Sequence, residues 1–202
     1  MRIRTIFECG GKHLYAVLFE ETDSIKDPEF YSNIEGEKEN LTKNEFDKAL
    51  DRWQDVEYIR LFFIKYRTDL TSFDSAISVS NAVKYTTEDA AELISKLDEI
   101  ETNADVKQFE ELFKPLVNDE QDDPPYELQR LKGKGSRHKS WLRLYALRYG
   151  DSYVVTGGAI KLTHGMKGRP HLKFELFKLD LVRKFLEDND KMGLAGFIDI
   201  PV

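Results

Sequence analysis

The chain has little of what secreted, membrane-spanning or disulfide-stabilised proteins need. Cys9 is the single cysteine among 202 residues, which excludes an intramolecular disulfide and favours a reducing compartment. No apolar run approaches the ~20 residues that cross a bilayer. The first residues also lack the apolar segment of a secretory leader. These absences predict a cytoplasmic protein without a membrane partner.

Motifs of nucleotide and metal chemistry are missing as well. The glycine-rich segments 133–135 and 157–158 lack the spacing of a phosphate-binding loop. No Cys/His cluster has the spacing of a zinc site, and His164 with His171 would make a poor pair of ligands. We therefore predict no metal and no cofactor. Cys9, beside two glycines, is more typical of a turn or strand end than of a reactive thiol.

Charge is distributed unevenly along the chain. The net charge of −7 taken alone argues against a nucleic-acid partner. However, residues 1–128 carry −15, residues 129–184 carry +11 and residues 185–202 carry −3. This asymmetry indicates a basic patch for a polyanionic partner, or an acidic portion that covers that patch. The alternative is that the two portions complement each other within one fold.

The most informative stretch runs from residue 140 to residue 189. Two segments rich in Tyr, Val and Leu flank Gly150-Asp151, which predicts an antiparallel hairpin with a tight turn. Pro170 suits the first turn of a helix, and apolar residues then recur at steps of three and four. We expect this amphipathic helix to cover one face of the hairpin.

The rest of the chain predicts a second hairpin and several helices. Gly10-Gly11 provides the turn of a hairpin over residues 1–21, and Thr42 with Glu45 forms a capping box for the first of two paired helices. Another helix should begin at Thr86. The C-terminal apolar segment should dock as an edge strand or against the first hairpin. We predict one α+β domain over residues 1–202, an antiparallel sheet with helices packed on it, and a helical insertion at 42–85.

The C-terminal hairpin also carries the candidate site. By period-two alternation its aliphatic residues Leu142, Leu144 and Ala146 should face the helix, while Trp141, Arg143 and Tyr145 form the other face. That second face is suited to phosphate contacts and base stacking. The predicted RNA-binding residues are Trp141, Tyr145, Arg137, Lys139, Lys167 and Arg169. Aromatic and arginine stripes of this kind also cover an adjoining layer or a protein partner.

Metal-independent RNA cleavage needs a base for the 2′-hydroxyl, cations for the developing charge, and an acid for the leaving oxygen. In this chain Arg143 and Lys161 are candidates for the cations. His164 or His171 is the candidate acid or base. These four residues form the predicted catalytic set.

The same stretch resembles the C-terminal half of the RelE/HigB-like toxins, especially their phage-derived branch. There an Arg-bearing strand, here Arg143 in LRLY, pairs with an aliphatic strand ending in a Lys-Thr-like element, here residues 161–163. A basic break, here Arg169-Pro170, precedes a terminal amphipathic helix. The resemblance covers residues 86–190 and leaves residues 1–85 without a counterpart.

This resemblance implies a small α+β fold, cleavage of mRNA on or off the ribosome, and neutralisation by an antitoxin protein. Two hypotheses follow. The first is a toxin component of a toxin–antitoxin-like system, an mRNA interferase-like endoribonuclease with RNA or the ribosome as partner. The alternative is a non-enzymatic module of RelE-like fold that binds protein or nucleic acid.

Overall fold

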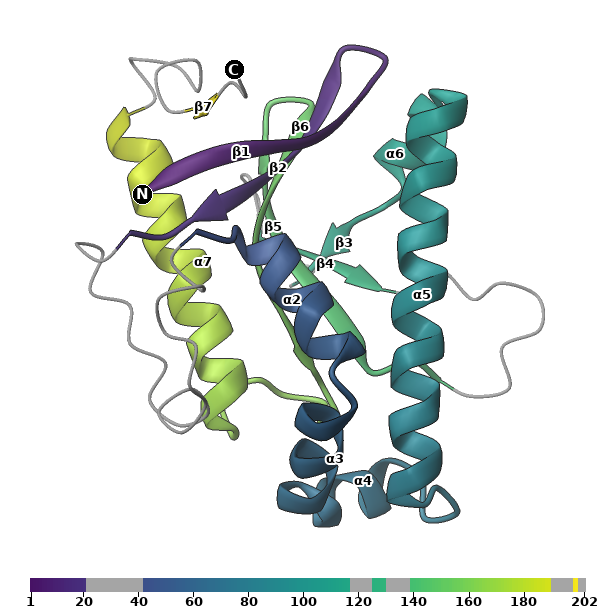
Figure 1. Cartoon of the computed structure of the whole chain (residues 1–202). Coiled ribbons are helices and arrows are strands. Elements are labelled where there is room, and N and C mark those ends of the chain that lie inside the picture. Colours follow the sequence, from purple (N-terminus) through teal and green to yellow (C-terminus); the bar gives the residue numbers. More distant parts are fainter. Residues whose placement is uncertain (21–41, 117–124, 130–138, 190–197, 200–202) are drawn as a thin grey trace.

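A computed structural model describes residues 1–20, 42–116, 125–129, 139–189 and 198–199 (Figure 1). Their α+β class agrees with the prediction. The order of elements along the chain is β1 (Arg2–Cys9), β2 (Lys12–Leu18), α2 (Glu45–Gln54), α3 (Val56–Lys65), α4 (Arg67–Phe73), α5 (Val79–Asn103), α6 (Val106–Glu110), β3 (Lys114–Pro115), β4 (Pro125–Gln129), β5 (Leu142–Tyr149), β6 (Ser152–Ile160), α7 (Pro170–Asn189) and β7 (Ile198–Asp199).

The described strands form one mixed sheet in the order β3-β4-β5-β6-β2-β1-β7. Both predicted hairpins are present, β1–β2 and β5–β6, and each is antiparallel. Gly10, Gly11 and Gly150 have φ values of 59°, 81° and 57°, which a residue with a side chain rarely adopts. The two turns therefore form where these glycines allow them.

The expectation of a wholly antiparallel sheet is wrong. Strand β2 pairs with β6 in parallel, from Leu14 opposite Tyr153 to Ala16 opposite Val155. Strand β7 also lies parallel to β1, with Ile198 opposite Ile3, so the C-terminal segment adds an edge strand to the first hairpin. Local turns fix the direction of strands within a hairpin, but they do not fix how two hairpins meet.

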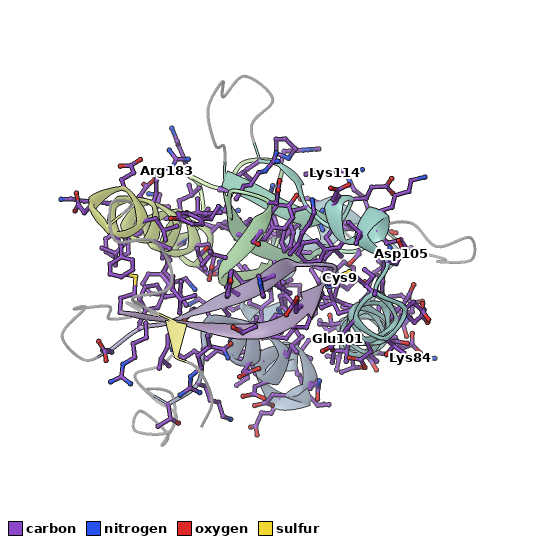
Figure 2. All side chains as sticks on the ribbon, turned by 90° about the horizontal axis from the view of Figure 1, so that it is seen from above. Cys9, Lys84, Glu101, Asp105, Lys114 and Arg183 are labelled. Atoms are coloured by element: carbon purple, nitrogen blue, oxygen red, sulfur yellow. The ribbon has the colours of Figure 1, made fainter. Side chains whose placement is uncertain are left out.

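Helices pack on both faces of the sheet. Figure 1 and the view from above in Figure 2 show α7 on one side of the long strands and α2 on the other. Leu142, Leu144 and Ala146 belong to the core beneath α2, α3 and α5, whereas Tyr145 and Leu147 pack under α7. The predicted orientation of the hairpin is therefore reversed. With both faces covered, alternation along the strand does not reveal which face meets which helix.

Two helix starts also differ from prediction. Helix α2 is capped by Asn44 rather than Thr42, because the Asn44 side-chain oxygen accepts a hydrogen bond from the Asp47 amide at 3.0 Å. Helix α5 is capped by Ser78 and begins at Val79, so Thr86 lies inside it instead of starting it. The expected boundary between residues 42–85 and 86–190 thus falls within one continuous helix.

Strands β2 and β6 separate beyond Val155, and this opening positions α2. Their pairing ends at Ala16 and Val155, while β6 continues to Ile160. Helix α2 packs against this part of β6, where a Cβ atom on Gly158 would lie 2.9 Å from the Ala49 side chain and 2.8 Å from Trp53. The absence of a side chain at Gly158 therefore lets α2 approach the strand.

Candidate functional site

Trp141 and Tyr145 do not form an exposed stacking face. Both side chains are 0% exposed. The indole N–H of Trp141 donates to the Thr86 hydroxyl at 2.9 Å, and its ring packs edge-on against Phe63 and Phe73. Tyr145 lies in the core beneath α7. Buried rings cannot stack on bases, so the exposed aromatic face predicted for this strand is wrong.

Arg143 and Lys161 lie at the same end of the β5–β6 hairpin. Arg143 pairs with Ala159 in the register, and the Lys161 amide donates to the Trp141 carbonyl at 2.8 Å. Both side chains are half-buried. Nη1 of Arg143 donates to the carbonyls of Ser140 at 3.2 Å and Leu142 at 2.7 Å. The Arg143 guanidinium is therefore engaged with the chain at the start of β5.

His171 is packed into the protein at the first turn of α7. Its ring contacts Phe62 and Tyr66, with centroid distances of 5.1 and 4.7 Å. Nε2 lies 3.1 Å from the Ile160 carbonyl, which as an acceptor selects the tautomer with a proton on Nε2. Burial lowers the pKa of His171 to about 4. With its ring half-buried and its pKa lowered, His171 is a neutral packing residue in this arrangement.

Arg169 joins the start of α7 to α4. Its Nε and Nη2 atoms each lie 2.5 Å from a carboxylate oxygen of Asp69, a bidentate pair. The hydrogen bond from Arg169 holds the pKa of Asp69 below its usual value. The Asp69 side chain is 10% exposed and that of Arg169 is 37% exposed. This ion pair brings the segment before α7 against the N-terminal helices.

Figure 1 shows α3 and α4 at the end of the molecule where α7 starts. Exposed basic residues belong to these elements and to the segments that precede β5 and α7. The ammonium groups of Lys65 and Lys139 each lie 5.7 Å from an aromatic ring centroid, those of Tyr66 and Phe73. We call this group the basic end; its members are Lys65, Arg67, Lys139, His164 and Lys167, all exposed. The predicted residue Arg137 lies outside the described residues.

Sequence reasoning missed Lys65 and Arg67, because the basic charge was expected only between residues 129 and 184. The Asp69–Arg169 ion pair brings α4 beside that segment. The segment from Lys161 to Arg169 itself contains no acidic residue. The basic end therefore combines cations from both charge portions of the chain.

An open groove adjoins the basic end between α4 and α5. Its volume is about 480 Å³. It is lined by Arg67 together with hydroxyl-bearing and apolar side chains, among them Thr71, Ser75, Ser78 and Ile77. Arg67 is the one basic residue among those that line the groove.

Cys9 is not placed as a reactive thiol. It is 1% exposed, and its Sγ lies 3.9 Å from the Ile100 carbonyl (Figure 2). Burial raises its pKa above the usual value, with a smaller contribution from Asp105. A buried thiol with a raised pKa reacts slowly, because the thiolate is the nucleophile. This agrees with the expected strand-end role.

Comparisons with protein-family models, with curated proteins and with solved structures found no match. In the described part of the chain, no helix is long and apolar enough to cross a membrane. Within the same residues, no group of three or more His, Cys, Asp or Glu side chains is arranged to hold a metal ion.

Proposed function

We propose that this chain is a non-enzymatic nucleic-acid-binding module whose basic end contacts the phosphate backbone of RNA. One observation carries the proposal: the Asp69–Arg169 ion pair brings the segment before α7 beside α4, so that exposed Lys65, Arg67 and Lys167 belong to neighbouring elements. Of the residues that cleavage would require, His171 is packed against Phe62 and Tyr66, and Arg143 donates to two backbone carbonyls.

Phosphate contacts suit this surface better than base recognition does. Lysine and arginine side chains neutralise phosphates without reading sequence. The two aromatic residues that would have stacked on bases, Trp141 and Tyr145, are sealed in the core. We therefore expect binding that depends strongly on salt and weakly on base sequence.

RNA cleavage has less support than binding. A general base must reach the proton that it removes and should titrate near the working pH. His171 is packed against Phe62 and Tyr66, and its pKa is about 4. Arg143 donates to two backbone carbonyls. Of the four predicted catalytic residues, His164 alone is classed as exposed.

Membership of the RelE-like fold also remains a proposal. The antiparallel β5–β6 hairpin followed by α7 supports it. The toxin function and the antitoxin partner rest on that likeness alone. Fold likeness does not establish an activity, which has to be argued from the site.

Binding is tested by fluorescence anisotropy with a labelled oligouridine over a range of salt concentrations. We expect the logarithm of the affinity to fall linearly with the logarithm of salt, with a slope of about −0.7 per single-strand phosphate contacted. The double variant Lys139→Glu/Lys167→Glu should weaken binding and flatten that slope. The matched control is Lys107→Glu/Lys114→Glu, two exposed lysines on α6 and β3.

Two results would overturn the proposal. One is the absence of binding at low salt. The other is an equal loss of affinity in both double variants, which would mean that net charge alone drives the association. Cleavage of the oligouridine by wild type, and its loss in Arg143→Ala/Lys161→Ala, would favour the toxin hypothesis instead.

A further inference from the structure

Helix α3 exposes an unusual amount of apolar surface. In the described part of the chain the exposed large hydrophobic residues are Val56, Leu61, Ile64 and Phe177, at 57%, 47%, 49% and 50% exposure. Three of these four lie on the ten residues of α3. Single exposed hydrophobic residues are common, but a cluster on one short element marks an interaction site.

Among the described residues, the outer face of α3 is exposed. Its opposite face supplies Ile59, Phe62 and Phe63 to the core, each at most 2% exposed. The outer face therefore carries apolar side chains together with charged ones. Such a mixed exposed face is suited to a partner that matches both its apolar and its charged residues.

Three exposed cations lie on or beside this apolar surface. Arg60 lies four residues after Val56 and four before Ile64, so it stands between them on the same face. Lys65 lies four residues after Leu61 and borders the surface, and Arg67 begins the next helix. All three cations are exposed, and the exposed acidic residues Asp55 and Glu57 lie at the N-terminal end of α3.

We propose that the outer face of α3 docks an acidic amphipathic helix of a partner protein. The apolar stripe of that helix would cover Leu61 and Ile64, and its flanking carboxylates would meet Arg60 and Lys65. Helix-on-helix packing of this type uses apolar residues at steps of three and four, and Leu61 and Ile64 are three residues apart. The proposal does not depend on nucleic-acid binding at the basic end.

A second copy of this chain is a poorer occupant. Pairing α3 with α3 would bring Arg60, Lys65 and Arg67 of each copy into the same small interface. Like charges across an interface disfavour association. With an acidic partner the same cations would attract the partner's carboxylates and fix the orientation of its helix.

The test uses labelled model peptides of about 18 residues, long enough to form a helix. One carries leucine at steps of three and four with glutamate elsewhere, the second replaces glutamate by lysine, and the third scrambles the acidic sequence. We expect the acidic amphipathic peptide alone to bind. The double variant Leu61→Ser/Ile64→Ser should weaken the affinity for this peptide by about tenfold or more. The reason is that a few apolar anchor residues carry most of the binding energy in such contacts.

Phe177→Ser is the matched control, because Phe177 is an equally exposed apolar residue on α7. It should leave peptide affinity unchanged. Circular dichroism should show that all variants remain folded, since the altered side chains are about half exposed. RNA anisotropy should not respond to Leu61→Ser/Ile64→Ser, which separates this proposal from the function of the basic end.

Four outcomes would overturn the docking proposal. The first is that the acidic peptide fails to bind. The second is that it binds the double variant as tightly as it binds wild type. A third outcome is that the lysine peptide binds equally well, which would mean that the contact is non-specific hydrophobic association. The last is that sedimentation shows a concentration-dependent dimer that Leu61→Ser/Ile64→Ser abolishes. This result would assign the outer face of α3 to a second copy of the chain.

Discussion

Lys178 on α7 and Glu45 on α2 form a buried ion pair between helices that pack on opposite faces of the sheet. Nζ of Lys178 lies 2.8 Å from Oε2 of Glu45, and the two residues are 133 positions apart in sequence. Their side chains are 2% and 7% exposed. The same ammonium group lies 2.8 Å from Glu175. One buried cation therefore joins two buried carboxylates.

Gly157 makes room for this cluster. A Cβ atom at Gly157 would clash with the Glu175 carboxylate and with the Lys178 ammonium. The cluster lies beside the part of β6 that extends past its pairing with β2. Lys48 and Arg52 on α2 also face Glu45 and lower its pKa. The opening of the sheet and the glycine together allow α7 to reach α2.

Loss of the Lys178 charge should be strongly destabilising. Lys178→Met would leave Glu45 and Glu175 buried without their shared cation, and breaking a buried pair costs about 3–5 kcal/mol. Urea denaturation followed by circular dichroism measures this loss. The triple variant Glu45→Met/Glu175→Met/Lys178→Met should recover most of it, because apolar residues of similar volume replace the three buried groups, while Lys48 and Arg52 are only half-buried. Equal stability of the single and triple variants would contradict this account.

The two carboxylates should respond oppositely to amide substitution. Burial alone would raise the pKa of Glu45, but Lys178, Lys48 and Arg52 together lower it to about 2. Burial raises the pKa of Glu175, which outweighs the attraction of Lys178. Oε2 of Glu175 has no hydrogen-bond partner among the described residues. Glu45 is thus the ionised carboxylate, whereas burial of Glu175 favours its protonated form.

The sign of each pH effect follows from linkage. Glu45 contributes stability above its unfolded pKa of 4.5, and this is lost as pH falls toward about 2. Glu175 contributes stability below 4.5, and this is lost as pH rises through its raised pKa. Glu45→Gln should therefore destabilise at neutral pH by about 2–3 kcal/mol, whereas Glu175→Gln should cost less or stabilise. Denaturation of both variants across pH provides the comparison, and equal losses would refute it.

Gly158 should not tolerate a side chain. Its Cβ would lie within 2.9 Å of Trp53 and Ala49 on α2, so Gly158→Ala requires the helix to shift. Overpacking of this kind typically costs about 1–3 kcal/mol. Gly165→Ala is the control, because a Cβ there meets nothing within 4 Å. Thermal denaturation that shifts equally for both variants would show that α2 does not press on β6.

Local signals allowed about half of this fold to be predicted. Gly10-Gly11, Gly150-Asp151 and Pro170 act within a few residues, and the hairpins and α7 form where they indicate. The parallel junction of β2 with β6 has no local signal, because it joins residues far apart in sequence. The start of α5 was missed because Ser78 precedes a weakly apolar stretch that the hydrophobic pattern does not reveal.

The sequence predicted which residues of the candidate site are basic, but it did not predict which of its side chains are buried. The exposed residues Lys139, His164 and Lys167 lie at one end, as the basic segment indicated. Burial of Trp141 depends on α3, α4 and α5, and none of these contacts can be derived from the strand alone. A lysine within an amphipathic helix, such as Lys178, is expected to be exposed when only the sequence is known. Its burial depends on Glu45, which is distant in sequence and meets Lys178 only in the folded chain.

His171 provides the last prediction, because its ring is neutral in the folded chain. Burial lowers its pKa from 6.5 to about 4, so below pH 6.5 the unfolded chain takes up a proton that the folded chain does not. Stability should therefore fall by about 2 kcal/mol from about pH 7 to about pH 5. His171→Gln keeps a donor for the Ile160 carbonyl and should remove this dependence. Urea denaturation at both pH values measures it. A variant that loses stability as steeply as wild type over this range would place the titrating group elsewhere and return His171 to the list of candidate bases.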